Sequence, residues 1–437
     1  MRTRPSIMDS VCLTLCAVVA GTAYAAAVKT PVSPATTSTG PGQALSREAL
    51  VWQPLYEPGC GGAITAVAVS PHDSQHLISL GDMLGVATSF DGGDSWQSTF
   101  GFLSYEFSGG ITFHPTDRNI VWIGSATGPY KSTDRGIHWV SKRQGMPEPS
   151  AGRYTAIIEK VLFDPDQPYR LLAFGGTSRN WNETESFGWI WESTDSGENW
   201  RHIGTITDAG FTTEAKKGAN IHWMQYEPGS NSRLHLRTGA GNWFISDDDG
   251  RTWRQHQPQG LPARPSSITF HPKNGSIVWV TTGSYLTGEG DATRQPGGVF
   301  KSTDGGKTFV SSDSSIKKVN AKSQGSLSSN FNNIVISPAN PDILFTNDGA
   351  WNASIIYKST DGGANWFPVA SREGIGVEHA HAGTPVFHPK TATFAGISVT
   401  GVPDPQSAER NYWYNTEFIL RTRDGGKTWD DATAYQP

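Results

Sequence analysis

The stretch Ser89-Phe90-Asp91-Gly92-Gly93-Asp94-Ser95-Trp96 is the first of seven copies of one eight-residue turn. The copies share the pattern Ser/Thr-x-Asp-x-Gly-x-x-Trp, except that Phe309 replaces the tryptophan in the fifth copy. The other six copies begin at Ser132, Ser193, Ser246, Ser302, Ser359 and Thr422. Successive copies start 43, 61, 53, 56, 57 and 63 residues apart. This spacing predicts a repeat protein with one supersecondary unit per copy.

The residue types of the turn suit a β-hairpin. The aspartate can accept hydrogen bonds from backbone N–H groups of its own turn. The glycine permits a positive φ where a Cβ atom would clash. The tryptophan supplies a large buried surface at the start of the next strand. We therefore expect a structural turn in each repeat.

These turns resemble the Asp box, or bacterial neuraminidase repeat. This motif occurs in sialidases, in the xyloglucanases of glycoside hydrolase family 74, in sortilin-type receptors and in photosystem assembly factors. In those families the box joins the third and outermost strands of a propeller blade. The resemblance implies an all-β fold, a seven-bladed β-propeller with an Asp box in each blade, in which the seven aspartates are structural. The closest resemblance is to one propeller of the family 74 xyloglucanases.

The composition agrees with an all-β protein that has many turns. The 437 residues include 49 Gly, 27 Pro and 16 Trp, and charged residues make up 17%. The net charge of −5 and the lack of a polybasic run argue against a nucleic-acid partner or an anionic membrane surface. We predict a monomer with no cofactor and no bound metal.

Residues 1–25 have the pattern of a secretory signal peptide. Arg2 and Arg4 give a positive start, residues 11–20 form a short apolar run, and Ala23-Tyr24-Ala25 offers a cleavage site. The run is too short to span a bilayer comfortably, so we expect no membrane anchor. Residues 26–48 are predicted to be a flexible leader and residues 49–437 the propeller. The protein would then be secreted or periplasmic.

Each repeat also carries a proline turn after its first strand, and a second and a third strand then lead into the box. His114, His271 and His388 precede the proline in three repeats, so we interpret them as turn residues and not as metal ligands.

The proline turns and the boxes are expected on one face of the propeller. The loops from second to third strand, and from one blade to the next, would then lie on the other face. Insertions in these loops at residues 177–188, 284–298 and 402–417 are candidate walls of a binding site.

Asp82 is the strongest candidate for a catalytic carboxylate. The stretch from Gly61 to Gly85 resembles the first blade of the family 74 xyloglucanases, where an Asp-x-Gly-Gly motif supplies a catalytic carboxylate. Met83-Leu84-Gly85 departs from the second half of that motif. Asp348 stands in the equivalent loop of blade six and is the candidate partner. Glycoside hydrolysis needs two carboxylates, one to protonate the leaving oxygen and one to activate water or attack.

The family 74 enzymes take their second carboxylate from a second propeller, whereas this sequence contains one set of seven boxes. The resemblance therefore leaves the second group open among Asp348, Glu183, Glu185, Glu289 and Asp291.

Histidines and aromatic residues are the candidate substrate-binding groups. His379 and His381 alternate along the first strand of blade seven and would share one face, and His222 holds a comparable place in blade four. They could bind an acidic sugar, act as the base in β-elimination from a uronate, hold a divalent ion, or be hydrogen-bonded histidines of the channel. Aromatic residues of the inserted loops could stack on sugar rings or pack the loops down. These aromatics include Trp181, Tyr285, Tyr412 and Trp413.

The sequence thus predicts a secreted, polysaccharide-active glycoside hydrolase that resembles the xyloglucanases and cleaves a glucan-type glycan. One alternative is a polysaccharide lyase that acts on an acidic glycan through channel His or Tyr groups. Another is a non-catalytic carbohydrate- or protein-binding propeller. A sialidase is disfavoured because the sequence has no Arg-Ile-Pro-like motif near its N-terminus.

Overall fold

The computed structural model describes residues 64–81, 85–99, 110–125, 127–147, 158–179, 184–214, 218–290, 293–318, 329–350, 353–371, 381–382, 386–391, 395–400, 417–428 and 430–431. The chain splits into two compact units, residues 1–54 and residues 55–437. Every described residue belongs to the second unit. These residues form strands and turns without any α-helix. None of their segments is a helix long and apolar enough to cross a membrane.

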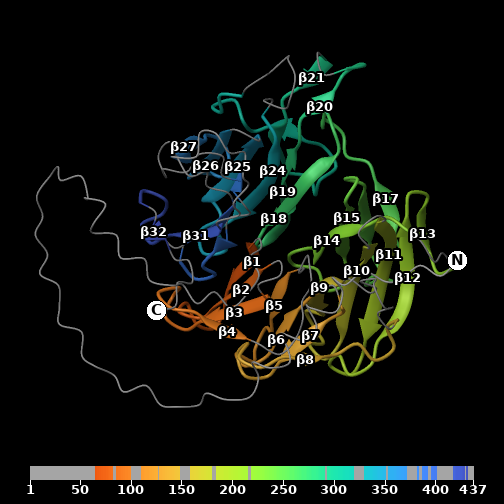
Figure 1. The fold of residues 1–437 in the computed structure, drawn as a ribbon. Coiled ribbons are helices and arrows are strands. Elements are labelled where there is room, and N and C mark those ends of the chain that lie inside the picture. Colours follow the sequence, from red (N-terminus) through yellow and green to blue (C-terminus); the bar gives the residue numbers. More distant parts are fainter. Residues whose placement is uncertain are drawn as a thin grey trace, which may run out of the picture. The chain divides into compact units, whose positions relative to one another are not determined.

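The strands form antiparallel sheets that follow one another along the chain (Figure 1). The first sheet is β1 (Ile64–Val69), β2 (Leu77–Gly81), β3 (Gly85–Ser89) and β4 (Gln97–Thr99). The second is β5 (Ile111–Phe113), β6 (Val121–Ile123), β7 (Tyr130–Ser132) and β8 (Val140–Ser141). The third is β9 (Ile158–Phe163), β10 (Leu171–Arg179), β11 (Thr184–Ser193), β12 (Arg201–Thr207) and β13 (Gly210–Thr212). The fourth is β14 (Ile221–Tyr226), β15 (Leu234–Thr238), β16 (Trp243–Ser246) and β17 (Arg254–His256).

The remaining sheets repeat the same meander. The fifth is β18 (Pro265–His271), β19 (Asn274–Thr282), β22 (Gly298–Ser302) and β23 (Val310–Ser311). A separate hairpin, β20 (Tyr285–Leu286) and β21 (Arg294–Gln295), is inserted between β19 and β22. The sixth is β24 (Phe331–Ile336), β25 (Leu344–Ala350), β26 (Ala353–Ser359) and β27 (Phe367–Ser371). In the seventh, β28 (His381–Ala382) and β29 (Val386–Phe387) both pair with β30 (Ala395–Thr400), followed by β31 (Glu417–Thr422) and β32 (Asp430–Asp431).

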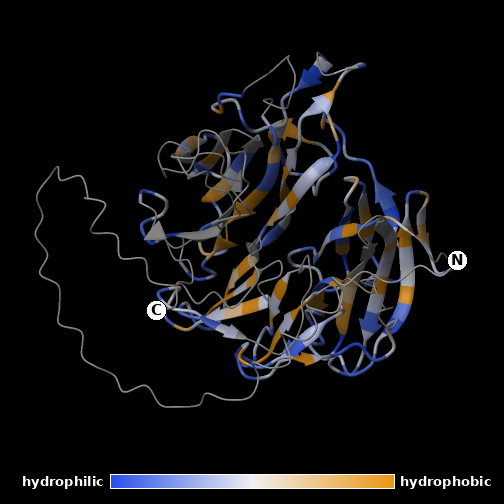
Figure 2. Ribbon diagram, viewed as in Figure 1, coloured by the Kyte–Doolittle hydropathy of each residue, from blue (hydrophilic) through white to orange (hydrophobic). Residues whose placement is uncertain are grey.

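The hydrophobic core lies between neighbouring sheets. Buried clusters join the first sheet to the second, the second to the third, and so on to the sixth. The rings of Phe345 and Phe387 stack 5.0 Å apart between the sixth and the seventh. Val386 of the seventh sheet packs against the buried cluster that contains Val67 and Trp96 of the first. Many strands carry both hydrophobic and hydrophilic positions (Figure 2). Meandering sheets packed in this sequence make the fold an all-β β-propeller, as the sequence predicts.

The repeated turn is held by its own side chains in all seven copies. The Oδ1 atom of the aspartate accepts from the first-position hydroxyl at 2.7–2.9 Å. It also accepts from the seventh-position backbone N–H at 2.8–2.9 Å. Its Oδ2 atom accepts from the seventh-position side chain at 2.5–2.8 Å. The predicted hydrogen bonds to the backbone are therefore confirmed.

The fifth-position glycine of every copy has a positive φ, between 82° and 92°. In four copies the missing side chain also leaves room for the preceding sheet, because a Cβ atom would lie within 2.9 Å of a side chain there. A Cβ atom on Gly197, for example, would lie 2.2 Å from the Trp122 ring. Glycine is thus required by the turn in every copy, and in these four copies also by the packing of one sheet on the next.

The boxes lie against the proline turns of their own sheets. In six sheets the fourth-position N–H of the box donates to a carbonyl of the proline turn at 2.8–3.0 Å, as from Gly92 to Gln75. This contact confirms the prediction that both turns share one face. His114 and His388 each accept two backbone N–H groups at Nδ1, and His271 accepts one. Their predicted role as turn residues is also confirmed.

A cation just before the box connects one sheet to the next in four places. Lys131, Lys301 and Lys358 each donate through Nζ to the fourth-position carbonyl oxygen of the following box. Arg421 of the seventh sheet donates in the same way to the carbonyl oxygen of Gly92 in the first. The contact between the last and first sheets therefore repeats the contact between consecutive ones.

Candidate functional site

The first strands of five sheets carry a β-bulge at one equivalent place. In each, the pairing with the second strand skips one residue. Each skipped residue is polar and stands six positions before the proline of its turn. They are Thr65, Glu159, His222, Ser266 and Asn332. Bulges re-aim side chains and are common beside active sites, so these five bulge residues form the candidate site.

Three of the bulge residues line one cavity. This basic cavity, of about 390 Å³, is bordered by His222, Ser266 and Asn332 together with Arg237 and Arg264. A neighbouring cavity of about 350 Å³ shares Arg264 with it. Both volumes lie in the range of small-ligand sites, which is about 300–1,000 Å³. The turn from β15 to β16 and the connection from β17 to β18 border both cavities. They belong to the loop classes that the sequence analysis placed on the binding face.

The electrostatics of the basic cavity come from His222 and Arg237. Desolvation by the surrounding residues, followed by the charge of the nearby Arg237 guanidinium, lowers the pKa of the His222 imidazole. Its Nε2 atom lies 2.8 Å from Nδ2 of Asn220, which donates to it. Burial also lowers the pKa of Arg237 to about 10. The cavity thus holds two arginine charges close to a neutral imidazole.

Glu159 is a candidate site residue that the sequence analysis missed. It is the bulge residue of β9, its side chain is half-buried, and burial raises the pKa of its carboxyl to about 7. Among the described residues, no group pairs with this carboxylate. A carboxyl group that remains protonated near neutral pH can act as a general acid. The available signal was its spacing from Pro165, which equals the spacing of His222 from Pro228.

Asp348 lies in a strand and not in the loop predicted for it. Asp348 lies within β25 opposite Phe331, as Gly81 lies opposite Ile64 in the first sheet. It therefore corresponds to Gly81, and the predicted equivalence with Asp82 is wrong by one residue. Its side chain is 3% exposed, and Oδ1 accepts the Asn330 N–H at 2.8 Å. Thr238 and Thr282 occupy the same register position in the fourth and fifth sheets, and their hydroxyl groups also accept backbone N–H groups.

The other predicted residues are placed as follows. Tyr285 is half-buried in β20 and does not border either cavity. His381 lies in β28, where its backbone pairs with Thr400. The predicted loop 177–188 is instead a hairpin, because both of its arms extend β10 and β11. Glu289 is exposed in the turn between β20 and β21. The residues outside the described ranges are Asp82, His379, Trp181, Tyr412, Trp413, Glu183 and Asp291.

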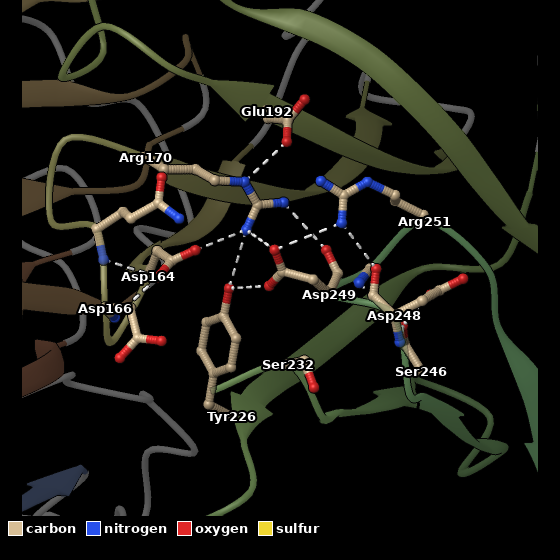
Figure 3. Close-up of polar contacts among 12 residues, drawn as sticks. Asp164, Asp166, Arg170, Glu192, Tyr226, Ser232, Ser246, Asp248, Asp249 and Arg251 are labelled. Carbon is tan, nitrogen blue, oxygen red and sulfur yellow. Dashed lines mark hydrogen bonds and ion pairs between the residues drawn. The ribbon is translucent and has the colours of Figure 1, made fainter. Parts of the chain in front are cut away.

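A second charged cluster surrounds Arg170 and is structural (Figure 3). Arg170 is 5% exposed and forms ion pairs with Asp164, Glu192 and Asp249 at 2.9, 2.8 and 2.5 Å. Burial acts to lower the pKa of Arg170, but the carboxylates of Asp164 and Glu192 outweigh it and raise this pKa. Asp249 belongs to the box of the fourth sheet, whereas Arg170 precedes β10 in the third. The cluster thus joins two sheets and leaves its arginine fully paired.

Comparisons with known proteins bear on the fold and the site. A model of the family described as "Sortilin, neurotensin receptor 3" matches residues 188–337. Xyloglucanase Xgh74A of Acetivibrio thermocellus is 26% identical over 304 residues, which cover 62% of this chain and 32% of that protein. A xyloglucanase of Paenibacillus sp is 22% identical over 324 residues, covering 62% and 26%. The match thus spans about a third or less of these curated relatives.

Solved structures share the fold at low identity. The GH74 xyloglucanase from Xanthomonas campestris aligns with a TM-score of 0.54 and 15% identity, over 87% of this chain and 68% of that one. YCF48 from Cyanidioschyzon merolae aligns with a TM-score of 0.50 and 15% identity, over 78% and 94%. These likenesses support the fold, and the chain is a β-propeller similar to the GH74 xyloglucanases.

Proposed function

We propose that this protein is a secreted, monomeric glycoside hydrolase that cleaves a polysaccharide by carboxylate acid–base chemistry. Its scaffold would be a seven-bladed propeller with an Asp box in each blade. Seven boxes with one hydrogen-bonding pattern, and the repeat of the Lys131, Lys301 and Lys358 contact by Arg421, support this scaffold. The sequence similarity to xyloglucanases supports a polysaccharide substrate.

The observation that carries the proposal is the set of bulge residues with Glu159 among them. Glu159 would serve as the general acid, because burial raises the pKa of its carboxyl to about 7. It would donate its proton to the glycosidic oxygen as the bond to the anomeric carbon breaks. Asp82 would be the second carboxylate, taking a proton from the attacking water or attacking the anomeric carbon itself. Asp348 would keep the backbone in place beside the site.

A lyase is the second candidate, and the basic cavity favours it. In β-elimination, a base removes the proton next to a uronate carboxylate while a cation stabilises the charge that develops there. A carbon–carbon double bond then forms as the C–O bond to the leaving sugar breaks, and the released oxygen takes up a proton. His222 would be the base, and Arg237 and Arg264 would face the carboxylate.

The test uses the full chain and its Asp82→Asn variant on a panel of neutral and acidic polysaccharides, with xyloglucan included. New reducing ends and the ultraviolet absorbance of unsaturated uronates are followed together. The proposal expects reducing ends without absorbance, reduced about 10²–10⁴-fold in the variant. Absorbance that survives in Asp82→Asn and disappears in His222→Ala would establish the lyase. Binding without any products would establish a binding propeller.

A further inference from the structure

The basic cavity contains cations without counter-ions. The described residues that border it, and those that border its neighbour, include no aspartate or glutamate. Arg237 is half-buried and donates through Nη1 to the carbonyl oxygen of Thr238 at 3.1 Å. Its Nε atom is buried and has no partner in the described part of the chain. Arg264 is exposed and reaches the carbonyl oxygen of Ala240 through Nη1 at 3.4 Å.

This arrangement differs from that of other buried arginines in the chain. Arg170 forms ion pairs with Asp164, Glu192 and Asp249, and Arg421 forms one with Asp94. A partly buried guanidinium without an anion lowers the stability of the fold. An anionic ligand that enters the cavity would supply the missing partner to Arg237, and the planar guanidinium groups suit a carboxylate.

The neighbouring cavity has a different chemistry. Its border combines the apolar surfaces of Pro258, Leu261 and Pro262 with the side-chain amides of Gln255 and Gln257. Apolar surfaces can pack against the C–H groups of a sugar ring, while amides can both donate to and accept from its hydroxyls. Because Arg264 borders both cavities, this surface, which suits a sugar ring, lies directly beside the basic cavity.

We propose that the two cavities are adjoining subsites for an acidic polysaccharide. The carboxylate of one uronate would lie between Arg237, Arg264 and His222, and the next sugar would lie over Pro258, Leu261 and Pro262. This inference rests on the proposed function and names the substrate class of the same site. It departs from a neutral glucan, because the bound chain must carry carboxylates.

The test is calorimetric titration of the full chain with a galacturonate trisaccharide and, as the matched uncharged ligand, its methyl ester. We expect the acid to bind at least about tenfold more tightly than the ester. Arg237→Gln and Arg264→Gln should each weaken binding of the acid by about tenfold or more and leave that of the ester unchanged. Arg264 is exposed, so its variant should fold even if Arg237→Gln does not. Arg118→Gln, in the proline turn of the second sheet, is the control and should bind like the wild type.

Equal affinities for acid and ester, wild-type binding by Arg264→Gln, or no binding would overturn the inference. A peptide with a free C-terminal carboxylate that binds more tightly than the trisaccharide, and loses this binding in Arg264→Gln, would assign the cavity to a protein ligand instead. Titration detects binding without turnover. If the acid does not bind preferentially, the protein can still hydrolyse neutral polysaccharides. If the protein hydrolyses nothing, binding of the acid can still be measured.

Discussion

The fifth-position glycine of the repeated turn has two reasons to lack a side chain, and Gly197 shows both. Its φ is +84°, and a Cβ atom would lie 2.2 Å from the Trp122 ring of the preceding sheet. Gly197→Ala should therefore strain the turn and push the sheets apart. We expect a loss of roughly 2–4 kcal/mol in stability, measured by chemical denaturation of the full chain.

Ser196 is the matched control, because it is the adjacent residue of the same turn and has a φ of +60°. Its backbone carbonyl accepts from Lys131, a contact that glycine preserves. Ser196→Gly should be neutral or should stabilise the protein by roughly 0.5–1 kcal/mol, since it relieves a left-handed conformation. A destabilised Ser196→Gly, or an unaffected Gly197→Ala, would contradict this account of the turn.

At the scale of the element, the bulge of β9 leads to a pH-dependent prediction. Burial raises the pKa of Glu159 in the folded protein to about 7, above its ordinary value of 4.5. The folded state therefore holds this proton more tightly than the unfolded state. The stability that depends on the proton is complete below the ordinary pKa and is lost as the pH rises toward 7.

Glu159→Gln should remove this dependence, because the amide stays neutral. Relative to the wild type, its Tm should be higher by a few degrees at pH 8 and unchanged at pH 4, as measured by calorimetry at both values. An equal shift of Tm at both pH values would mean that the carboxyl is not protonated near neutrality. It would also remove the argument for a general acid.

The sequence predicted the elements that repeat and missed what depends on register. The seven turns and the proline turns follow local rules of hydrogen bonding, so their residue types identify them without a structure. Every copy has a polar donor at the seventh position, such as Ser95 or Asn199, but its hydrogen bond to the aspartate was not predicted. Asp348 was misplaced by one residue because the match rested on the Asp-Gly letters of its loop, whereas strand pairing aligns Asp348 with Gly81 and not with Asp82. Arg237 and Arg264 come together only through packing between sheets, which no local pattern reports.

At the scale of the whole molecule, Arg421 links the last described sheet to the first. Its side chain is 5% exposed, and it binds the carbonyl oxygen of Gly92 and the carboxylate of Asp94. Arg421→Ala would leave the Gly92 carbonyl without this donor at the contact between the two sheets. We expect a loss of about 2–4 kcal/mol, together with earlier opening of the two sheets in hydrogen exchange.

Arg423 provides the comparison, because it pairs with the same Asp94 oxygen at 3.0 Å but is 53% exposed. Arg423→Ala should cost less than about 1 kcal/mol, as is usual for surface ion pairs. Equal losses of stability in Arg421→Ala and Arg423→Ala would show that the Arg421 contact does not hold the last described sheet to the first.

The central claim is that the propeller hydrolyses a polysaccharide with Glu159 as the general acid. The most direct measurement is the rate at which the wild type and Glu159→Gln release reducing ends, from pH 4 to pH 9. The substrate is the polysaccharide of the panel that the wild type cleaves fastest. The account predicts a wild-type rate that falls as the pH rises through about 7. It predicts a rate about 10²–10⁴-fold lower in the variant. An unchanged rate in Glu159→Gln, or no reducing ends from any polysaccharide with the wild type, would contradict it.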